Sequence, residues 1–422
     1  MQPSHRVGTA GLCALVVIAM AIVPAGAKVT AIKYVSWYTG ESTKSAIALF
    51  EKEYPSIDVQ FSSPGDYQTK VITMASAGVM PDVIEMENSM VYLFGDPGLL
   101  EDMNQYIKRD KLDTGDFIGE YLKAFMYEGK LTAVPLYINS GALAYNQTMF
   151  QQAGVAYPDQ SGKDHWDWTD LLGAAKKLTR DTNGDGKFEV YGWGEQPHWF
   201  YQHWLCQNSG RFFSLDLKDV MVDEPLAVEA FQFQADLVNV RKVAYHGYQD
   251  SFAGQKVAMF QGNSWMFPAW RKVKGLKFDL APFQWQKKPY AELTANGLAI
   301  SKLSKSKDAA WAFVKWMTSK TGQIALSAVP GFMPARLSVA RSDVFMKVTP
   351  PEHNEYIIDM ALRARVGDVS SILPNRVMDA FLPEFDKVIA GKTSAVEGMR
   401  KAAPVMQRAL DDWNKRRLSR RK

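Results

Sequence analysis

Oxygen-bearing side chains recur at every second position in one short segment, Asp181-Thr182-Asn183-Gly184-Asp185-Gly186. Four of its residues match positions one, three, five and six of a calcium loop: Asp181, Asn183, Asp185 and Gly186. The twelfth position, which usually supplies a bidentate Glu, is Gly192, so Glu189 at position nine is the carboxylate left to complete the set. We therefore expect either a low-coordination calcium site on Asp181, Asn183, Asp185 and Glu189, or a tight Asn-Gly and Asp-Gly turn before a strand at residues 188–193.

Short motifs that carry most enzymatic chemistry are missing from the sequence. It has no G-x-x-x-x-G-K-[ST] loop, no G-x-G-x-x-G turn, no H-E-x-x-H pair and no G-x-S-x-G elbow. His198, His203 and Cys206 lie near one another along the chain, but their spacing matches no known zinc pattern. Glu85 and Glu87 would share one face of a strand, as glycosidase carboxylates or as two solvated acids. We expect a binding protein rather than an enzyme.

Aromatic residues form the second group with chemical potential. Several of them lie in loops or at strand ends rather than on helical stripes: Trp37, Tyr38, Tyr137, Trp193, Trp199, Trp204, Trp265, Trp270 and Trp285. Flat aromatic rings suit the C–H faces of sugars, while Glu, Asp, Asn and Arg side chains pair with hydroxyl groups. Burial in a core is an equal alternative for any one Trp, but the set as a whole predicts a carbohydrate-binding cleft.

The elements that position these residues alternate between strands and helices. Apolar runs predict buried strands at residues 31–37, 58–61 and 82–86, separated by helices at 42–54 and 67–77. This βαβαβ order predicts a mostly parallel sheet covered by helices, so the fold class is α/β. Further apolar stripes predict helices at 169–178, 225–238, 306–317 and 394–413, and the last one opens with the capping box Ser394-Ala395-Val396-Glu397.

Charge and the amino-terminal segment restrict the cellular setting. The chain of 422 residues carries 49 Lys and Arg against 45 Asp and Glu, a balance that argues against a nucleic-acid partner. Residues 1–27 have a basic start, an apolar run at 12–23 and small residues at Ala25-Gly26-Ala27, which is typical of a secretory signal. We expect cleavage after Ala27 and export. The alternative, an uncleaved anchor, would need roughly 20 apolar residues. After cleavage, Cys206 is the remaining cysteine, which excludes an internal disulfide.

A series of segments, in order along residues 28–420, resembles the extracellular solute-binding proteins of ABC-type sugar importers, the family that includes the maltose-binding protein. The segments are Trp37-Tyr38-Thr39-Gly40, Phe50-Glu51-Lys52-Glu53-Tyr54-Pro55, Ala77-Gly78-Val79-Met80-Pro81-Asp82-Val83, Gly98-Leu99-Leu100-Glu101-Asp102-Met103, Ala133-Val134-Pro135-Leu136-Tyr137, Leu143-Ala144-Tyr145-Asn146, Phe260-Gln261-Gly262-Asn263-Ser264-Trp265 and Asn296-Gly297-Leu298-Ala299-Ile300. Each segment alone is weakly informative, whereas the ordered set is specific. Glu85-Met86-Glu87-Asn88 is more acidic than in many relatives.

The resemblance implies a type II periplasmic-binding-protein-like fold, with two α/β lobes joined by two or three crossover segments. The crossovers are expected near residues 135–140, 292–297 and 330–340. Lobe one is expected to take residues 28–138 and 295–335, and lobe two residues 139–294 and 336–422. The ligand is expected between the lobes, at the carboxyl ends of strands.

The resemblance also implies which residues contact the ligand. From lobe one and the first crossover these are Trp37, Tyr38, Tyr67, Glu87, Asn88 and Asn139. From lobe two we expect Trp193, Trp199 and Trp265 as stacking platforms and Arg376 as a donor. Asn296 and Gly297 are expected to offer amide and backbone groups, and Arg336 is a weaker candidate.

The implied function is the periplasmic substrate-binding component of an ABC importer. Such a protein captures a mono- or oligosaccharide between its lobes and delivers it to the membrane permease. It is expected to be a monomer that requires no cofactor, with Ca²⁺ as the one ion that its sequence could accommodate. Two alternatives stay open: a protein of the same fold that binds a glycerol phosphate ester or polyamine, and a secreted glycan hydrolase. Convergence of Arg271, Arg336 and Arg376 would favour an anion.

Overall fold

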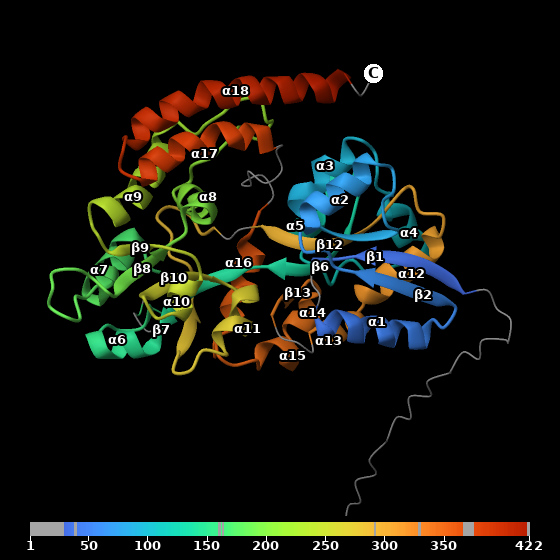
Figure 1. Ribbon diagram of the computed structural model, residues 1–422, viewed down its shortest axis with the longest axis horizontal. Coiled ribbons are helices and arrows are strands. Elements are labelled where there is room, and N and C mark those ends of the chain that lie inside the picture. Colours follow the sequence, from blue (N-terminus) through green and yellow to red (C-terminus); the bar gives the residue numbers. More distant parts are fainter. Residues whose placement is uncertain are drawn as a thin grey trace, which may run out of the picture.

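The computed structural model describes residues 29–37, 40–158, 162, 164–290, 293–327, 331–365 and 375–419, which form two lobes, each around its own sheet (Figure 1). The expected signal sequence with its cleavage after Ala27, and Tyr38, lie outside the described residues, as do the side chains of Trp199 and Arg376. Across the described ranges, no helix combines the length and the apolar character needed to span a membrane.

Lobe one is built on a six-stranded sheet in the order β13-β6-β12-β3-β1-β2. In chain order these strands are β1 (Thr30–Val35), β2 (Ile57–Ser62), β3 (Val83–Glu87), β6 (Val134–Asn139), β12 (Thr294–Ile300) and β13 (Met333–Pro334). β1 pairs in parallel with β2 and β3, which confirms the predicted βαβαβ start, whereas β12 runs antiparallel to β3 and β6.

Helices and one short hairpin complete lobe one. They are α1 (Glu41–Glu53), α2 (Tyr67–Ser76), η1 (Asn88–Met90), α3 (Val91–Gly95), α4 (Met103–Asp110), α5 (Gly119–Ala124), β4 (Met126–Tyr127), β5 (Lys130–Leu131), α12 (Lys307–Met317), α13 (Lys320–Leu326) and α14 (Leu337–Ala340). α1 and α12 meet through their apolar stripes, where the ring centroids of Phe50 and Phe313 lie 5.2 Å apart and both side chains are fully buried. This spacing of apolar residues at helical intervals is what directs one face of each helix to the sheet.

Lobe two is built on a five-stranded sheet in the order β11-β7-β10-β8-β9. Its strands are β7 (Gly141–Asn146), β8 (Tyr191–Glu195), β9 (Ala244–His246), β10 (Val257–Asn263) and β11 (Phe278–Ala281). β8 pairs in parallel with β9 and β10, and β7 runs antiparallel to β10 and β11. Every residue of β7 and β10 is buried, as expected of central strands that are covered on both faces.

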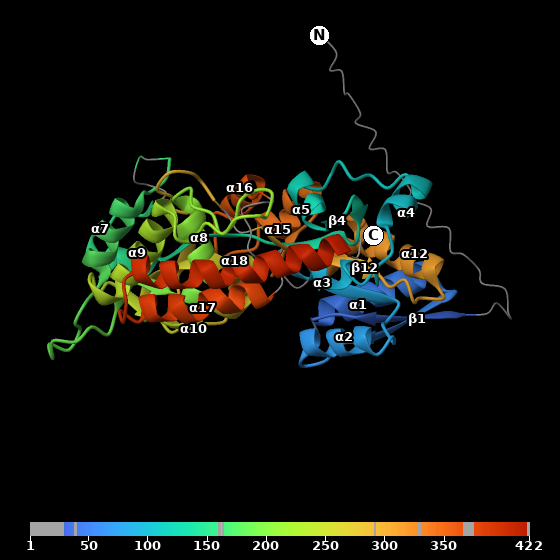
Figure 2. The same ribbon diagram turned by 90° about the horizontal axis from the view of Figure 1, so that it is seen from above.

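The helices of lobe two include a separate apolar cluster at its carboxyl-terminal side. They are α6 (Gln147–Ala153), α7 (Trp168–Leu178), α8 (Pro197–Gln207), α9 (Pro225–Asn239), α10 (Asp250–Ala253), η3 (Ser264–Met266), α11 (Phe267–Trp270), α16 (Glu355–Arg363), α17 (Asn375–Ile389) and α18 (Ala395–Ser419). α17 and α18 lie side by side and pack on α9 (Figure 2). Phe231, Phe381 and Leu410 are fully buried within this cluster.

The chain passes between the two sheets three times within the described residues. The first passage, at Ser140, joins β6 to β7, and the second joins β11 to β12. The third leaves β13 through α14 and α15 (Asp343–Met346) and ends at α16, which packs on β7. α14 packs on α13 and β13, so the chain stays with lobe one until at least Ala340. The limits of the lobes at single residues stay a prediction.

Candidate ligand-binding site

Strand register brings several carboxyl-terminal strand ends to the region between the lobes. In lobe one, β3 ends at Glu87, which pairs with Asn296. In the same sheet, Asn139 pairs with Thr294 immediately before the first passage. In lobe two, Asn263 at the end of β10 pairs with Gly141, immediately after that passage. β8 is parallel to β10, so it ends on the same side. This is where open α/β sheets bind ligands.

Glu85, two residues before the end of β3, is the centre of a buried polar network in lobe one. Its carboxyl accepts hydrogen bonds from Ser36 Oγ at 2.5 Å and from Asn296 Nδ2 at 2.7 Å, and Tyr34 Oη lies 3.4 Å away. Burial raises the pKa of Glu85, whose side chain is 1% exposed. Asn296 Oδ1 in turn accepts from Asn139 Nδ2 at 3.1 Å. The network therefore ties β1, β3 and β12 to the strand that leads into lobe two.

Two aromatic residues expected at the site form a stacked pair in lobe one. The rings of Trp37 and Tyr67 are 4.1 Å apart at 29°. Tyr67 is 3% exposed and its hydroxyl donates to the backbone carbonyl of Glu85, so it supports Trp37 instead of offering its own ring. Trp37 is half-buried, which leaves part of its surface accessible.

Asn88 and Gly297 have structural roles that differ from the predicted ligand contacts. Asn88 is 3% exposed and its amide is used twice, with Nδ2 donating to Leu293 O at 3.1 Å and Oδ1 accepting from Ala295 N at 2.9 Å. A Cβ on Gly297 would lie 2.9 Å from Phe125 Cζ, so glycine permits close packing there. Asn296 is likewise 4% exposed and committed to the Glu85 network. Glu87 is half-buried and accepts from Ser89 Oγ at 2.8 Å.

Trp193 was wrongly predicted as a stacking platform, because its side chain is 0% exposed. Its indole Nε1 donates to Glu195 Oε2 at 2.7 Å, and Gln234 Nε2 donates to Glu195 Oε1 at 2.9 Å. Burial raises the pKa of Glu195 to about 7. Trp193 and Glu195 share the inner face of β8, since alternate residues of a strand point the same way. Trp193 and Glu195 thus stabilise the end of β8 from inside lobe two.

Trp265 is the predicted lobe-two platform that the described structure leaves partly accessible. It lies in η3 directly after β10, and it is half-buried. The backbone of Ser264 donates to Ser140 O at 3.1 Å, which fixes this turn against the first passage between the lobes. Trp265 therefore sits at the interlobe end of β10, and its contact with the ligand stays a prediction.

The beginning of α8 adds Gln196, which the sequence analysis did not single out, and His198, which it considered only as a metal ligand. Gln196, at the end of β8, is 4% exposed, and its Oε1 has no hydrogen-bond partner among the described residues. His198 Nε2 lies 2.8 Å from Asp386 Oδ1 of α17, and both side chains are about half exposed. Burial lowers the pKa of nearby His246, and His198 lowers it further. The sequence signal for Gln196 and His198 was their position directly after a predicted strand. Many residues share that position, so it could not have selected them.

The structure does not bring His198, His203 and Cys206 together as a zinc site. His203 and Cys206 are buried in lobe two at 2% and 0% exposure, whereas His198 is half exposed and pairs with Asp386. Within the described residues, the group whose ligand atoms converge is Asp181, Asp185 and Glu189, with these atoms within 4.8 Å of one another.

The Asp181 loop has the shape of a tight turn with inward-facing oxygens. Asp181 Oδ1 accepts from Gly184 N at 2.6 Å and Oδ2 from Gly186 N at 2.8 Å, and these backbone donors lower the pKa of Asp181. Glu189 Oε1 accepts from Asn183 Nδ2 at 3.0 Å. These hydrogen bonds close the turn without an ion, so calcium binding stays a prediction.

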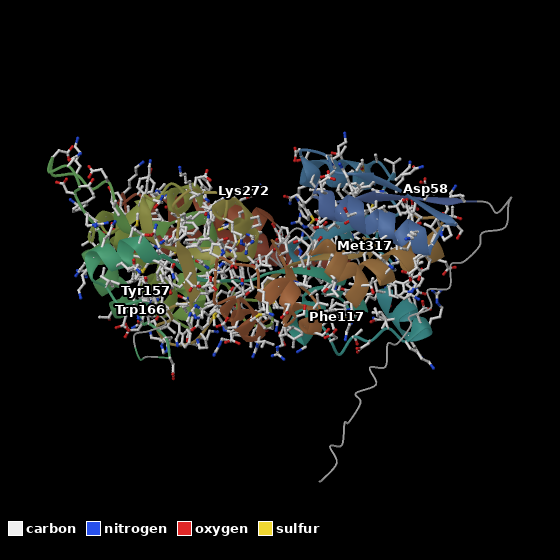
Figure 3. The ribbon with its side chains drawn as sticks, turned by 90° about the horizontal axis from the view of Figure 1, so that it is seen from below. Asp58, Phe117, Tyr157, Trp166, Lys272 and Met317 are labelled. Atoms are coloured by element: carbon white, nitrogen blue, oxygen red, sulfur yellow. The ribbon has the colours of Figure 1, made fainter. Side chains whose placement is uncertain are left out.

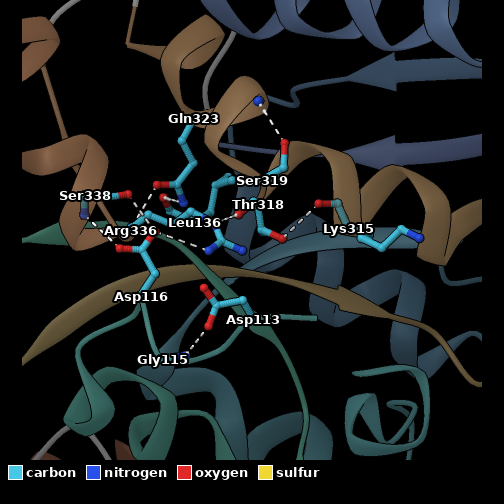
Figure 4. A network of polar contacts seen from close by, with 11 residues as sticks. Asp113, Gly115, Asp116, Leu136, Lys315, Thr318, Ser319, Gln323, Arg336 and Ser338 are labelled. Carbon is cyan, nitrogen blue, oxygen red and sulfur yellow. Dashed lines mark hydrogen bonds and ion pairs between the residues drawn. The ribbon is translucent and has the colours of Figure 1, made fainter. Parts of the chain in front are cut away.

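Arg336 is a structural residue of lobe one (Figure 4). It is 4% exposed, and its Nε donates to Thr318 O at 2.6 Å while its backbone N donates to Gln323 Oε1 at 2.8 Å. Its guanidinium carbon lies 4.5 Å from the centroid of the Phe117 ring, and Nη1 lies 3.4 Å from Asp116 Oδ2. Arg336 thus anchors the start of the third passage and was wrongly considered for ligand binding.

A pocket of about 560 Å³ lies within lobe two. Its described lining is Pro158, Asp164, His165, Trp166, Pro282, Trp285, Tyr356, Asp359 and Arg363. Seen from below, Trp166 lies on lobe two, far from Phe117 and Met317 of lobe one (Figure 3). His165 stacks on Trp285 at 3.7 Å, so one face of that indole is already covered. All of the described lining residues of this pocket thus come from lobe two.

Comparison with known proteins identifies the family. The sequence model of one protein family, described as bacterial extracellular solute-binding protein, matches residues 45–350. The maltotriose-binding protein of Pyrococcus abyssi is 23% identical over 309 residues, or 70% of this chain and 63% of that protein. The multiple sugar-binding protein of Streptococcus mutans is 25% identical over 303 residues, or 65% of this chain and 67% of that protein. The ABC substrate-binding protein Lmo0181 from Listeria monocytogenes, in complex with cycloalternan, has a TM-score of 0.78 at 25% identity and covers 91% of this chain and 100% of its own. The chain thus belongs to the bacterial extracellular solute-binding proteins and has their two-lobed, type II periplasmic-binding fold.

Proposed function

We propose that this protein is the periplasmic substrate-binding component of an ABC importer and holds a mono- or oligosaccharide between its lobes. The observation that carries the proposal is the placement of two half-buried indoles, Trp37 in lobe one and Trp265 in lobe two, at strand ends that border the interlobe region. Aromatic faces at both walls suit the C–H faces of a sugar ring. The names of the relatives, which bind maltotriose and multiple sugars, support the same class of ligand.

Polar groups near these indoles would select hydroxyl groups. Glu87 and Asn139 lie at strand ends of lobe one, and Gln196 and His198 lie at the start of α8, directly after β8. The buried Oε1 of Gln196 is an acceptor that a ligand hydroxyl would satisfy, which removes the cost of leaving it unpaired. A ligand that contacts both walls stabilises the arrangement with the lobes together, and release follows when the hinge passages let them separate.

Hydrolysis is disfavoured by the environment of the two buried carboxyls. A glycosidase needs two carboxyl groups that flank the scissile bond. Glu85 and Glu195 are 1% and 0% exposed, and each is enclosed by side chains of its own lobe. These two carboxyls are therefore not placed to flank a glycosidic bond, and we expect the bound sugar to leave chemically unaltered.

An anionic ligand, such as a glycerol phosphate ester, is less well supported. Arg271 Nε donates to Pro350 O at 2.6 Å, and burial lowers its pKa to about 10. Arg336 is committed to Thr318 and Asp116. These two guanidinium groups therefore serve the fold, and Arg376 is the member of the expected trio whose side chain lies outside the described residues.

Delivery to a membrane permease, a monomeric state, and export with cleavage after Ala27 belong to the same proposal. Membership in an extracellular solute-binding family supports export. The absence of a required cofactor and calcium binding at the Asp181 loop likewise stay proposals.

A thermal-shift screen tests the proposed ligand class. Neutral mono- and oligosaccharides are compared with glycerol phosphate esters and polyamines, because a ligand that binds the folded state raises the melting temperature. We expect a rise with at least one neutral sugar and none with the charged compounds. A rise confined to phosphate esters or polyamines would replace the sugar proposal.

A further inference from the structure

Beyond the passages at the hinge, a chain of three aromatic rings connects the lobes. Trp413 of α18 packs edge-on against Tyr92 of α3, with ring centroids 5.5 Å apart at 68°. Tyr92 in turn packs against Tyr127 at 5.6 Å and 82°. We propose that these three residues, here called the interlobe latch, hold the lobes together and set the affinity for solute without touching it. This inference rests on the proposed function only for its effect on affinity.

The lobe-two end of the latch is rigidly mounted. Leu410, one turn before Trp413, is fully buried in the apolar cluster formed with α9 and α17. Asn414 Nδ2 donates to Leu217 O at 2.8 Å, and the Gln407 side chain bonds to Lys218 O and Val220 N at 2.6 and 2.8 Å. α18 therefore moves with lobe two, and Trp413 is 5% exposed although it lies near the end of the helix.

The lobe-one end is equally well fixed. Tyr127 Oη donates to Asp96 Oδ1 at 2.7 Å, and a Cβ on Gly95 would lie 2.6 Å from Tyr127 Cγ, so the ring packs directly on that backbone. α3 follows η1, the short turn that begins directly after Glu87, and Glu87 ends the central strand β3 at the interlobe region. A shift of Tyr92 is thereby coupled to the position of that strand end.

The interlobe latch lies far from the passages about which the lobes would rotate. The Tyr92–Trp413 contact places the end of α18 beside α3. Figure 1 shows this end on the opposite side of the molecule from α13, α14 and α15, and the third passage between the sheets runs through α14 and α15. A rotation about those passages moves a distant contact farther than a near one, so opening would break the Tyr92–Trp413 contact. An aromatic pair of this kind contributes about 0.5–1.5 kcal/mol, which corresponds to a change of about 2- to 10-fold in the balance between closed and open forms.

Pulsed-EPR distances between spin labels at Ser45→Cys in lobe one and Lys177→Cys in lobe two test the latch. Both positions are exposed, whereas Cys206 is fully buried. We expect Tyr92→Leu and Trp413→Leu each to reduce the ratio of short to long distances about 2- to 10-fold, and the double variant to have no larger effect than the stronger single one. Val405→Ala, at a 43% exposed position of the same helix, is the control and should leave the ratio unchanged.

Distances that stay unchanged in Tyr92→Leu, with and without sugar, would overturn the latch. So would additive effects of the two substitutions, because independent residues add. If Trp413→Leu destabilises lobe two, the result for Tyr92→Leu still decides the test, because Tyr92 lies in lobe one. The readout without sugar does not depend on the ligand, so failure of the latch is distinguishable from failure of the sugar proposal. Where a sugar binds, its Kd should rise about 2- to 10-fold in either variant.

Discussion

Each lobe places a buried carboxyl near the end of a central strand, but the two carboxyls are held differently. Glu85 in lobe one is bound by Ser36 and Asn296, and its network continues to Asn139 at the first passage between the lobes. Glu195 in lobe two is bound by Trp193 and Gln234, both within the interior of that lobe. The comparison indicates that lobe one couples its site to the hinge, whereas lobe two supports its site locally.

The largest effect is expected from Trp265→Ala, which removes the platform of lobe two. A central aromatic contact is worth about 2 kcal/mol or more, so the Kd for the bound sugar should rise at least about 30-fold. Thermal unfolding should change little, because the side chain is only half-buried. Isothermal titration gives the affinity, with Trp285→Ala in the lobe-two pocket as the matched control. An unchanged Kd for Trp265→Ala would refute this assignment.

The difference between the networks predicts different results for two similar substitutions. Asn296→Leu and Gln234→Leu each remove one donor from a buried carboxyl, and each should lower the free energy of unfolding by about 2–3 kcal/mol in urea titrations. Asn296→Leu should also weaken sugar binding, because Asn139 loses its partner at the passage between the lobes. If Asn296→Leu and Gln234→Leu weakened sugar binding equally, the two carboxyl networks would not differ in their connection to the passages between the lobes.

Glu195 should make stability depend on pH. Its pKa is raised to about 7 by burial, so between its ordinary pKa and 7 the folded protein keeps a proton that the unfolded chain releases. The free energy of unfolding should therefore fall by on the order of 2 kcal/mol from pH 5 to pH 8. Glu195→Gln should flatten this decline in denaturant titrations at several pH values, and an unaltered slope would show that Glu195 is not responsible.

The smallest effect is expected from Tyr67→Phe. The substitution keeps the ring that stacks on Trp37 but removes the hydroxyl that donates to the Glu85 carbonyl. Stability should drop by about 1 kcal/mol with little change in sugar affinity. Tyr67→Ala, which also removes the stacking, should weaken binding as well; similar affinities for both variants would argue against a supporting role for the Tyr67 ring.

Periodicity and turn residues sufficed to predict the α/β class and the strand order at the start of the chain, because apolar spacing reports which face of an element is buried. The site was harder to predict because residue type does not reveal direction. Trp193 is of a residue type that suits stacking on a sugar, but its side chain lies on the buried inner face of β8. Asn88 and Asn296 have the amides expected of a sugar contact, yet those amides bond to the protein. The pair of Tyr92 and Trp413 depends on tertiary packing between distant segments, which no local pattern encodes.

Capture of a neutral sugar without chemical change can be measured by calorimetric titration of the protein with the sugar that raises its melting temperature, followed by mass analysis of the recovered sugar. We expect saturable binding of one sugar per chain, abolished or strongly weakened by Trp265→Ala, with the sugar recovered at its original mass. Cleaved products, or binding of a charged compound with no binding of any neutral sugar, would contradict it.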